Sequence, residues 1–122
     1  MNTQQVANRL VELCRKGENM QALEELYANR CTSQEMPGIP GEELVSGKEA
    51  ITKKSQEWYA SVEEFHGGGV SDPQVAGDHF SCVMDMDITF KGRGRIQMEE
   101  ICLYQVKDGE IVSEQFFYEM PS

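Results

Sequence analysis

Apolar residues in the first part of the chain recur at the spacing of an α-helix. They follow the i, i+3, i+4, i+7 rule after Thr3, which can cap a helix, and the pattern stops at Gly17. The members of this apolar stripe are Val6, Ala7, Leu10, Leu13 and Cys14. The pattern further predicts a second short helix over residues 20–27, a short strand over 30–36 and a glycine- and proline-rich loop over 37–47.

A third helix is predicted to begin at Ser46. Glu49 follows it by three residues, which is the spacing of a capping box. The side chains expected to face the core from this helix are Ile51, Ser55, Trp58, Tyr59 and Val62.

After the third helix the pattern changes to alternation, which is typical of strands. Three turn signals divide this region: Gly77-Asp78, the segment 91–95, and Asp108-Gly109, a strong two-residue hairpin signal. Strands are therefore predicted near 63–76, 79–90, 95–107 and 110–120. Helices followed by an antiparallel meander indicate an α+β fold.

Register arithmetic across the predicted 91–95 loop places one acid on an otherwise apolar face. The loop pairs Phe90 with Ile96 and sets Met86 opposite Glu100. The apolar members of this face are Phe80, Cys82, Met84, Met86, Ile88 and Phe90 on one strand and Ile96, Met98, Cys102, Tyr104 and Val106 on the next. The last strand is predicted to continue it with Ile111, Ser113, Gln115 and Phe117, and Phe117 is expected opposite Glu100.

A carboxylate in such surroundings is costly unless it is paired or protonated. Burial can raise a carboxyl pKa into the range useful for proton transfer near neutral pH. Glu100 is therefore the first candidate for a catalytic residue. Two alternatives stay open: hydrogen bonds from Gln115, Tyr104 or a helix residue could satisfy Glu100, or a β-bulge could turn it outward.

The opposite face of the meander mixes apolar and charged residues. Its apolar members are Val83, Ile101, Leu103, Val112, Phe116 and Tyr118. This is more apolar surface than a monomer usually exposes, so a homodimer formed through the sheet face is expected. Asp85, Asp87, Glu99 and Glu114 are predicted at its rim, where simple solvation is the alternative reading.

His66 is a further candidate whose direction the sequence leaves open. Alternation back from Val75 turns His66 outward, whereas a bulge near Asp72-Pro73 or in the glycine run 67–69 would bring it inside. The glycine run lacks the strand–loop–helix context of a phosphate-binding loop.

Composition restricts the kinds of partner. With 21 acids against 11 bases the formal charge is −10, which disfavours nucleic acid and anionic membranes. The four cysteines have no metal-ligand spacing, so neither a metal nor another cofactor is expected. The length of 122 residues predicts a single domain over 1–122, and the absence of a signal-like or membrane-spanning segment predicts a cytoplasmic protein.

The order of elements resembles the nuclear transport factor 2-like superfamily, and within it the SnoaL-like group. Segments 47–51, 75–80, 86–89, 98–104 and 106–118 carry the resemblance. It implies a cystatin-like cone, in which a curved antiparallel sheet of four to six strands wraps around three helices from the N-terminal half. It also implies a pocket on the concave face, commonly in a dimer, and acidic site positions at Asp87, Glu100 and Glu114. Members include steroid isomerases, polyketide cyclases, epoxide hydrolases and dehydratases, so fold alone does not choose an activity.

These observations predict a protein that binds a small hydrophobic molecule in an apolar pocket. It could act as a cofactor-independent isomerase, cyclase or dehydratase through Glu100. The residues expected to contact the ligand are Trp58, Tyr59, Met84, Met86, Tyr104, Gln115 and Phe117. The alternative is a non-enzymatic dimeric binding or interaction module of the same fold.

Overall fold

The computed structural model describes residues 1–36 and 44–119. Over these residues the chain forms three helices and seven strands. They are α1 (Thr3–Arg15), α2 (Asn19–Leu26), β1 (Tyr27–Gln34), β2 (Leu44–Ser46), α3 (Lys48–Ala60), β3 (Val62–Val70), β4 (Gln74–Ala76), β5 (His79–Phe90), β6 (Gly94–Lys107) and β7 (Glu110–Tyr118). The predicted strand end at residue 120, and the predicted loop except for 44–47, lie outside the described residues. The strand predicted over 63–76 is divided into β3 and β4.

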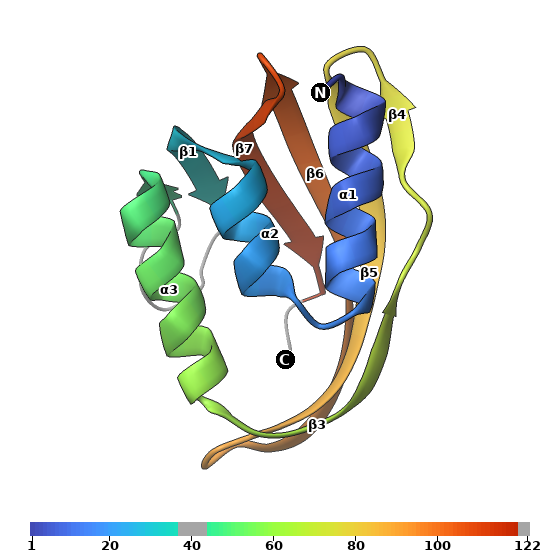
Figure 1. The fold of residues 1–122 in the computed structure, drawn as a ribbon. Helices are drawn as coiled ribbons and strands as arrows, with labels where there is room; N and C mark the ends of the chain where they lie inside the picture. Colours follow the sequence, from blue (N-terminus) through green and yellow to red (C-terminus); the bar gives the residue numbers. More distant parts are fainter. Residues whose placement is uncertain (37–43, 120–122) are drawn as a thin grey trace.

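The strands form one curved sheet in the order β2-β1-β7-β6-β5-β3, and the short β4 pairs with β5. Figure 1 shows the three helices over one face of this sheet, with β3, β5 and β6 curving past their lower ends. This arrangement confirms the predicted α+β cone. Two details differ: the described part of the sheet has seven strands instead of four to six, and β1 runs parallel to β7 instead of antiparallel. The face that meets the helices is called the inner face below, and the opposite one the outer face.

The helix ends differ from those predicted. Asn2, not Thr3, caps α1, and it does so in a capping box with Gln5. The capping box predicted at Ser46 does not form, because Ser46 belongs to β2 and the helix begins after Gly47. Gly47 has a φ of 98°, a conformation that glycine adopts without steric cost. The predicted second helix stops one residue early, since its last residue begins β1.

The predicted apolar face of β5 and β6 is the inner face, as expected. Its buried members are Phe80, Cys82, Met84, Ile88, Phe90, Cys102, Tyr104 and Val106. All of them except Ile88 and Phe90 share one core with the stripe of α1, which is buried at Val6, Ala7, Leu10, Val11 and Leu13. By contrast, α3 contributes little to the core, because Ile51 is its one buried residue.

The hairpin between β5 and β6 is tighter than predicted. Phe90 pairs with Gly94, so the turn consists of residues 91–93 and not 91–95. Gly92 and Gly94 both have a positive φ, which permits the tight reversal. The register is thereby shifted by two residues, and Glu100 lies opposite Met84 instead of Met86. A shift of two leaves every side chain on its predicted face.

The hairpin between β6 and β7 contains a β-bulge that the sequence did not reveal. Val106 pairs with Ile111 but Gln105 pairs with Ser113, so Val112 is an extra residue in β7. An extra residue reverses the alternation beyond it. Consequently Glu114, Phe116 and Tyr118 lie on the inner face. The prediction that Ser113, Gln115 and Phe117 face inward and that Glu114 lies at the outer rim was wrong.

Among the described residues, no helix has both the length and the apolar character needed to cross a membrane.

Candidate active site on the inner face of the sheet

Glu100 lies on the inner face of β6, between Met84 of β5 and Tyr118 of β7. The thiol of Cys102 contacts its Oε1 at 3.7 Å. Burial raises the pKa of the Glu100 carboxyl from its usual 4.5 to about 7, and the nearby carboxylate of Glu35 adds to this effect. Glu100 is therefore poised between its two protonation states at neutral pH.

Glu114 is a second acid on this face, and it lies deeper than Glu100. Its side chain is 6% exposed, although a rim position was predicted. The Tyr27 hydroxyl donates to its Oε1, and the Ser33 hydroxyl donates to its Oε2 at 2.6 Å. Burial raises the pKa of Glu114, and these two hydrogen bonds act against that increase. The parallel pairing of β1 with β7 brings these partners together, because Ser33 is the register partner of Glu114.

Lys54 of α3 supplies the positive charge at this site. Its Nζ lies 2.8 Å from Oε1 of Glu35 and donates to the Ser33 hydroxyl at 3.2 Å. The Tyr118 hydroxyl donates to the other oxygen of Glu35 at 2.9 Å. Lys54 thus connects Ser33, a hydrogen-bond partner of Glu114, with Glu35. We call Glu35, Glu100, Glu114 and Lys54, with the three hydroxyls of Tyr27, Ser33 and Tyr118, the inner acid cluster.

The inner acid cluster has the groups needed for proton transfer without a cofactor. Glu100 can accept or release a proton near neutral pH. Burial keeps Tyr118 protonated by raising its pKa, so its hydroxyl remains a hydrogen-bond donor. The positive charge of Lys54 favours the ionised form of Glu100, whereas the negative charges of Glu35 and Glu114 favour its protonated form. This combination of a neutralisable carboxyl with fixed donors suits chemistry in which negative charge develops on an oxygen.

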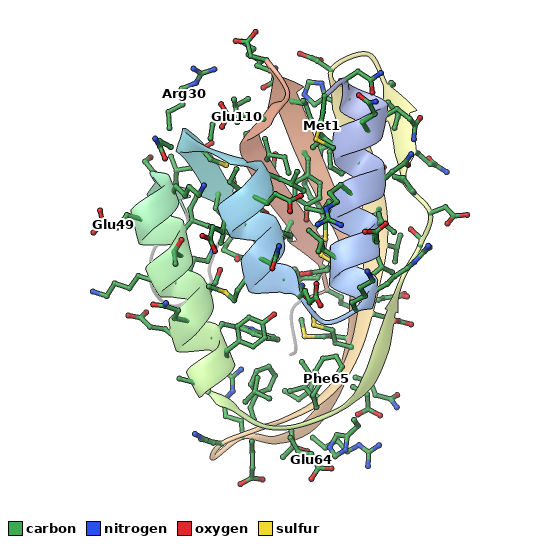
Figure 2. The ribbon with its side chains drawn as sticks, in the orientation of Figure 1. Met1, Arg30, Glu49, Glu64, Phe65 and Glu110 are labelled. Atoms are coloured by element: carbon green, nitrogen blue, oxygen red, sulfur yellow. The ribbon has the colours of Figure 1, made fainter. Side chains whose placement is uncertain are left out.

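Beyond Glu100, part of the inner face is exposed toward the lower end of the cone, although Ile88 and Phe90 stay buried there. Phe65 of β3 pairs with the inward-facing Ile88 of β5, yet it is 56% exposed. Figure 2 shows Phe65 directed toward the side of the helices and Glu64 directed away from them. Tyr59 is 41% exposed and Met86 is half-buried. We call Trp58, Tyr59, Phe65, Met86 and Met98 the open inner end.

The residues predicted to contact a ligand are divided between the core, the open inner end and the outer face. Trp58 meets the ring of Tyr59 edge-on at 5.2 Å and belongs to the open inner end with Met86. Met84 and Tyr104 are buried, and Tyr104 stacks on Phe80 at 4.8 Å. Gln115 and Phe117 are placed on the outer face by the bulge, away from the inner acid cluster.

Two of the predicted catalytic residues lie on the outer face. Asp87 binds Arg95 through a pair of hydrogen bonds of 2.9 and 2.8 Å, which lower the pKa of its carboxyl to about 2. His66 contacts Thr89 at 2.7 Å and Glu64 at 3.0 Å. The sheet therefore separates both side chains from Glu100. For His66, alternation gave the right direction, and the register shift at this residue of β3 does not turn it inward.

Glu100 lines neither of two hollows found in the described part of the molecule. One, of about 330 Å³, lies along β1 and β7 and includes the exposed Leu44 and Phe117 among its lining residues. The other, of about 620 Å³, lies over β5 and β6 beside Gly67 and Gly68. Its lining includes the outer-face carboxylates of Asp85, Asp87 and Glu99.

Comparison with known proteins places the sequence in a family. The model of the SnoaL-like domain matches residues 1–118. The chain belongs to the SnoaL-like family. None of the curated proteins matches this SnoaL-like chain.

Solved structures of similar proteins agree with this assignment. A Mesorhizobium loti protein, described as a candidate SnoaL-like polyketide cyclase with carbohydrate phosphatase as a second designation, is 39% identical. The match covers 97% of this chain and 100% of that protein, with a TM-score of 0.91. A Xanthomonas campestris protein with a cystatin-like fold is 14% identical over 98% and 92% of the two chains, with a TM-score of 0.81. A Catenulispora acidiphila protein with a ketosteroid isomerase-like fold, in complex with trimethylamine, is 22% identical over 98% and 88%, with a TM-score of 0.74. The last two show the fold alone.

Of the three acids implied by the SnoaL-like resemblance, Glu100 and Glu114 lie together on the inner face and Asp87 does not. Sequence reasoning did not identify Glu35 or Lys54 as part of the site. A signal for Glu35 was present, because it alternates with Cys31 and Ser33 on the predicted short strand. No comparable signal marked Lys54, since its contact with Glu35 depends on how α3 packs over β1.

Proposed function

We propose that the inner face of the cone binds a small apolar molecule and that Glu100 exchanges a proton with it. One observation carries this proposal: the Glu100 carboxyl, with a pKa raised to about 7, lies among apolar side chains on the face that becomes exposed at the open inner end. Buried groups with a pKa near the working pH are the usual acids and bases of enzymes.

The geometry suggests the size of the ligand. Glu100 and Ile96 lie four residues apart on β6, and Ile96 pairs with Ile88, the partner of Phe65. At about 3.3 Å per residue, the distance along the strand is about 13 Å. A ligand of that length could reach Glu100 with one end while its other end contacts Phe65. The side chains of Met86 and Met98, which lie between these levels, can adapt to irregular shapes.

The reaction class that fits best is a proton shift next to a carbonyl group. The Glu100 carboxylate would take a proton from the carbon beside the carbonyl, and the Tyr118 hydroxyl, turned from Glu35 toward the ligand, would donate a hydrogen bond to the developing enolate oxygen. Protonated Glu100 would then return the proton to another carbon, which completes an isomerisation without a cofactor. Lys54 would limit the cost of the added negative charge.

The comparisons indicate which compounds to test. The Mesorhizobium loti protein is described as a candidate polyketide cyclase, so polyketide-like ketones belong in a first panel with cyclic enones. The Catenulispora acidiphila protein holds trimethylamine, so small amines form a second panel. Binding would be detected as an increase in the melting temperature of the protein.

The decisive experiment measures deuterium exchange at the carbon beside the carbonyl of a bound compound by NMR. Glu100→Gln should lower the exchange rate at least about 100-fold while binding persists, because a glutamine cannot accept the proton. Glu99→Gln is the matched control, since Glu99 is the exposed neighbour on the outer face. Exchange at the wild-type rate in Glu100→Gln would refute the proposal.

The second candidate function is a dimeric binding module, and the outer face favours it. Four large apolar side chains are exposed there or at the edge of the sheet: Leu44 at 53%, Val83 at 40%, Ile101 at 50% and Phe117 at 41%. A second copy of the chain could cover them. Sedimentation velocity should then find a dimer that Ile101→Asp dissociates, whereas Phe65→Asp at the open inner end should leave it intact. A wild-type monomer at high concentration would exclude this module.

A further inference from the structure

Two thiols lie directly opposite each other beside Glu100. Cys82 of β5 and Cys102 of β6 are register partners, and both are buried on the inner face. Opposite residues of antiparallel strands have Cα atoms about 4.5 or about 5.5 Å apart. Both separations fall within the range of about 4.4–6.8 Å that a disulfide bond spans. The backbone therefore already brings the two cysteines within disulfide-bonding distance.

The pair is also connected to the inner acid cluster. The Cys102 thiol contacts Oε1 of Glu100 at 3.7 Å, and this hydrogen bond favours the ionised carboxyl. When the single S–H of Cys102 turns from Glu100 to Cys82, its hydrogen bond lowers the pKa of Cys82, although burial acts against this effect. A thiolate is the nucleophile in thiol oxidation, so Cys82 is the member of the pair that would react first.

We propose that Cys82 and Cys102 form a reversible disulfide bond when a peroxide enters the inner face, and that this bond changes the proton affinity of Glu100. The first part concerns the two cysteines alone. The second part rests on the proposed function, because it gives redox control over the group assigned to proton transfer.

The reaction balances with hydrogen peroxide as the oxidant. The Cys82 thiolate attacks one peroxide oxygen, the O–O bond breaks, and a sulfenic acid and one water result after protonation. The Cys102 thiol then attacks the sulfenic sulfur, the S–S bond forms, and a second water leaves. Two electrons pass from the two sulfurs to the peroxide. A thiol reductant reverses the bond by thiol–disulfide exchange once the site opens.

Burial defines which oxidants can act. Cys82 is 2% exposed and Cys102 is 0% exposed. A molecule close to the size of water can reach such thiols through small openings of the structure, whereas glutathione disulfide needs the larger opening that a thiol reductant also needs. Hydrogen peroxide should therefore oxidise the pair in the folded protein faster than glutathione disulfide does.

Tryptic peptide mapping tests the first part directly. Cleavage at Lys91, Arg93 and Arg95 separates the two cysteines, so the disulfide would join peptides 55–91 and 96–107. After peroxide treatment of the wild-type protein, this joined peptide is the expected product, and the intact mass should fall by about 2 Da for the bond. Cys31→Ser is the matched control, because Cys31 is equally buried but has neither member of the pair as its register neighbour. It should form the same disulfide, and Cys82→Ser should not.

Two results would overturn the first part: thiols of Cys82 and Cys102 that stay reduced, or a disulfide that joins either one to another cysteine. The second part is tested by carbon NMR titration of Glu100. In the oxidised protein, and in reduced Cys102→Ala, the titration midpoint should move to higher pH, because the thiol donor is gone. Reduced Cys102→Ser, which keeps a donor, should stay near the wild type. An unmoved midpoint in the oxidised protein would refute the control of Glu100.

These outcomes are distinguishable from failure of the proposed function. Peptide mapping and the NMR midpoint need no ligand, so both can succeed even if Glu100→Gln exchanges a ligand proton at the wild-type rate. Conversely, loss of exchange in Glu100→Gln would support the proposed function even if the two thiols resist peroxide.

Discussion

Replacing Glu100 by glutamine should make the protein less sensitive to pH. Glutamine has nearly the shape of a protonated glutamic acid but cannot ionise. In the wild-type protein the pKa of Glu100 is about 7 in the folded state, against a usual value of 4.5 for an unfolded chain. A carboxyl whose pKa is raised by folding contributes stability that is fully present below about pH 4.5 and is lost as the pH rises to and through about 7.

The size of this effect follows from the two values. The complete loss is about 3 kcal/mol, since each pH unit between 4.5 and about 7 contributes about 1.36 kcal/mol. At pH 5 about 1 kcal/mol is already lost, and at pH 8 nearly all of it. The difference in unfolding free energy between Glu100→Gln and the wild type should therefore increase by about 2 kcal/mol from pH 5 to pH 8.

Urea unfolding at these two pH values, followed by the fluorescence of the single tryptophan Trp58, measures this difference. The comparison removes contributions from the other titrating groups, which are present in both proteins. Glu99→Gln serves as the matched control, because Glu99 is the exposed neighbour of Glu100 on the outer face. A constant difference between Glu100→Gln and the wild type would show that folding does not raise the pKa of Glu100, and the reasoning about its burial would be refuted.

Three further substitutions test other parts of the structure. Glu114→Ala should lower the unfolding free energy by about 3 kcal/mol, because two buried hydroxyls lose their acceptor; a loss below about 1 kcal/mol in urea unfolding would contradict this. Gly68→Ala should cost about 2 kcal/mol or more, since its Cβ would lie 2.3 Å from a backbone oxygen, whereas Gly67→Ala, with nothing within 4 Å, should have little effect in the same assay. Lys54→Met should move the NMR titration midpoint of Glu100 to higher pH, because the lysine favours the ionised carboxyl; a shift to lower pH would exclude this role.

The sequence predicted the correct face of the sheet for Glu100, although the predicted pairing of β5 with β6 was wrong by two residues. The predicted hairpin loop of 91–95 was two residues too long, which paired Glu100 with the wrong partner. A shift of two residues still places each side chain on the correct face. The apolar character of its neighbours on the strand therefore identified the acid despite the incorrect register.

The rest of the site could not be read from local patterns. Lys54 lies on a helix that buries one residue, Ile51, so its helical position gave no reason to place it beside the sheet. Its contact with Glu35 depends on how α3 packs over β1, and the parallel pairing of β1 with β7, which brings Ser33 beside Glu114, joins segments far apart in the sequence. Turn and capping signals depend only on residues that are neighbours along the chain. The capping box predicted at Ser46 does not form because Ser46 belongs to β2, so strand pairing can override even a local signal.

One inserted residue decides the composition of the site. Without the bulge at Val112, alternation from Ile111 would direct Gln115 and Phe117 inward and Glu114 and Tyr118 outward, as the sequence pattern predicted. The apolar strip around Glu100 would remain, but it would lose the second acid and the hydroxyl that binds Glu35. The same fold would then hold Glu100 with Glu35 and Lys54 but without Glu114 and Tyr118. Members of this fold family can therefore share the cone and its curvature while differing in chemistry, and the bulge in β7 is the feature to compare before an activity is transferred between them.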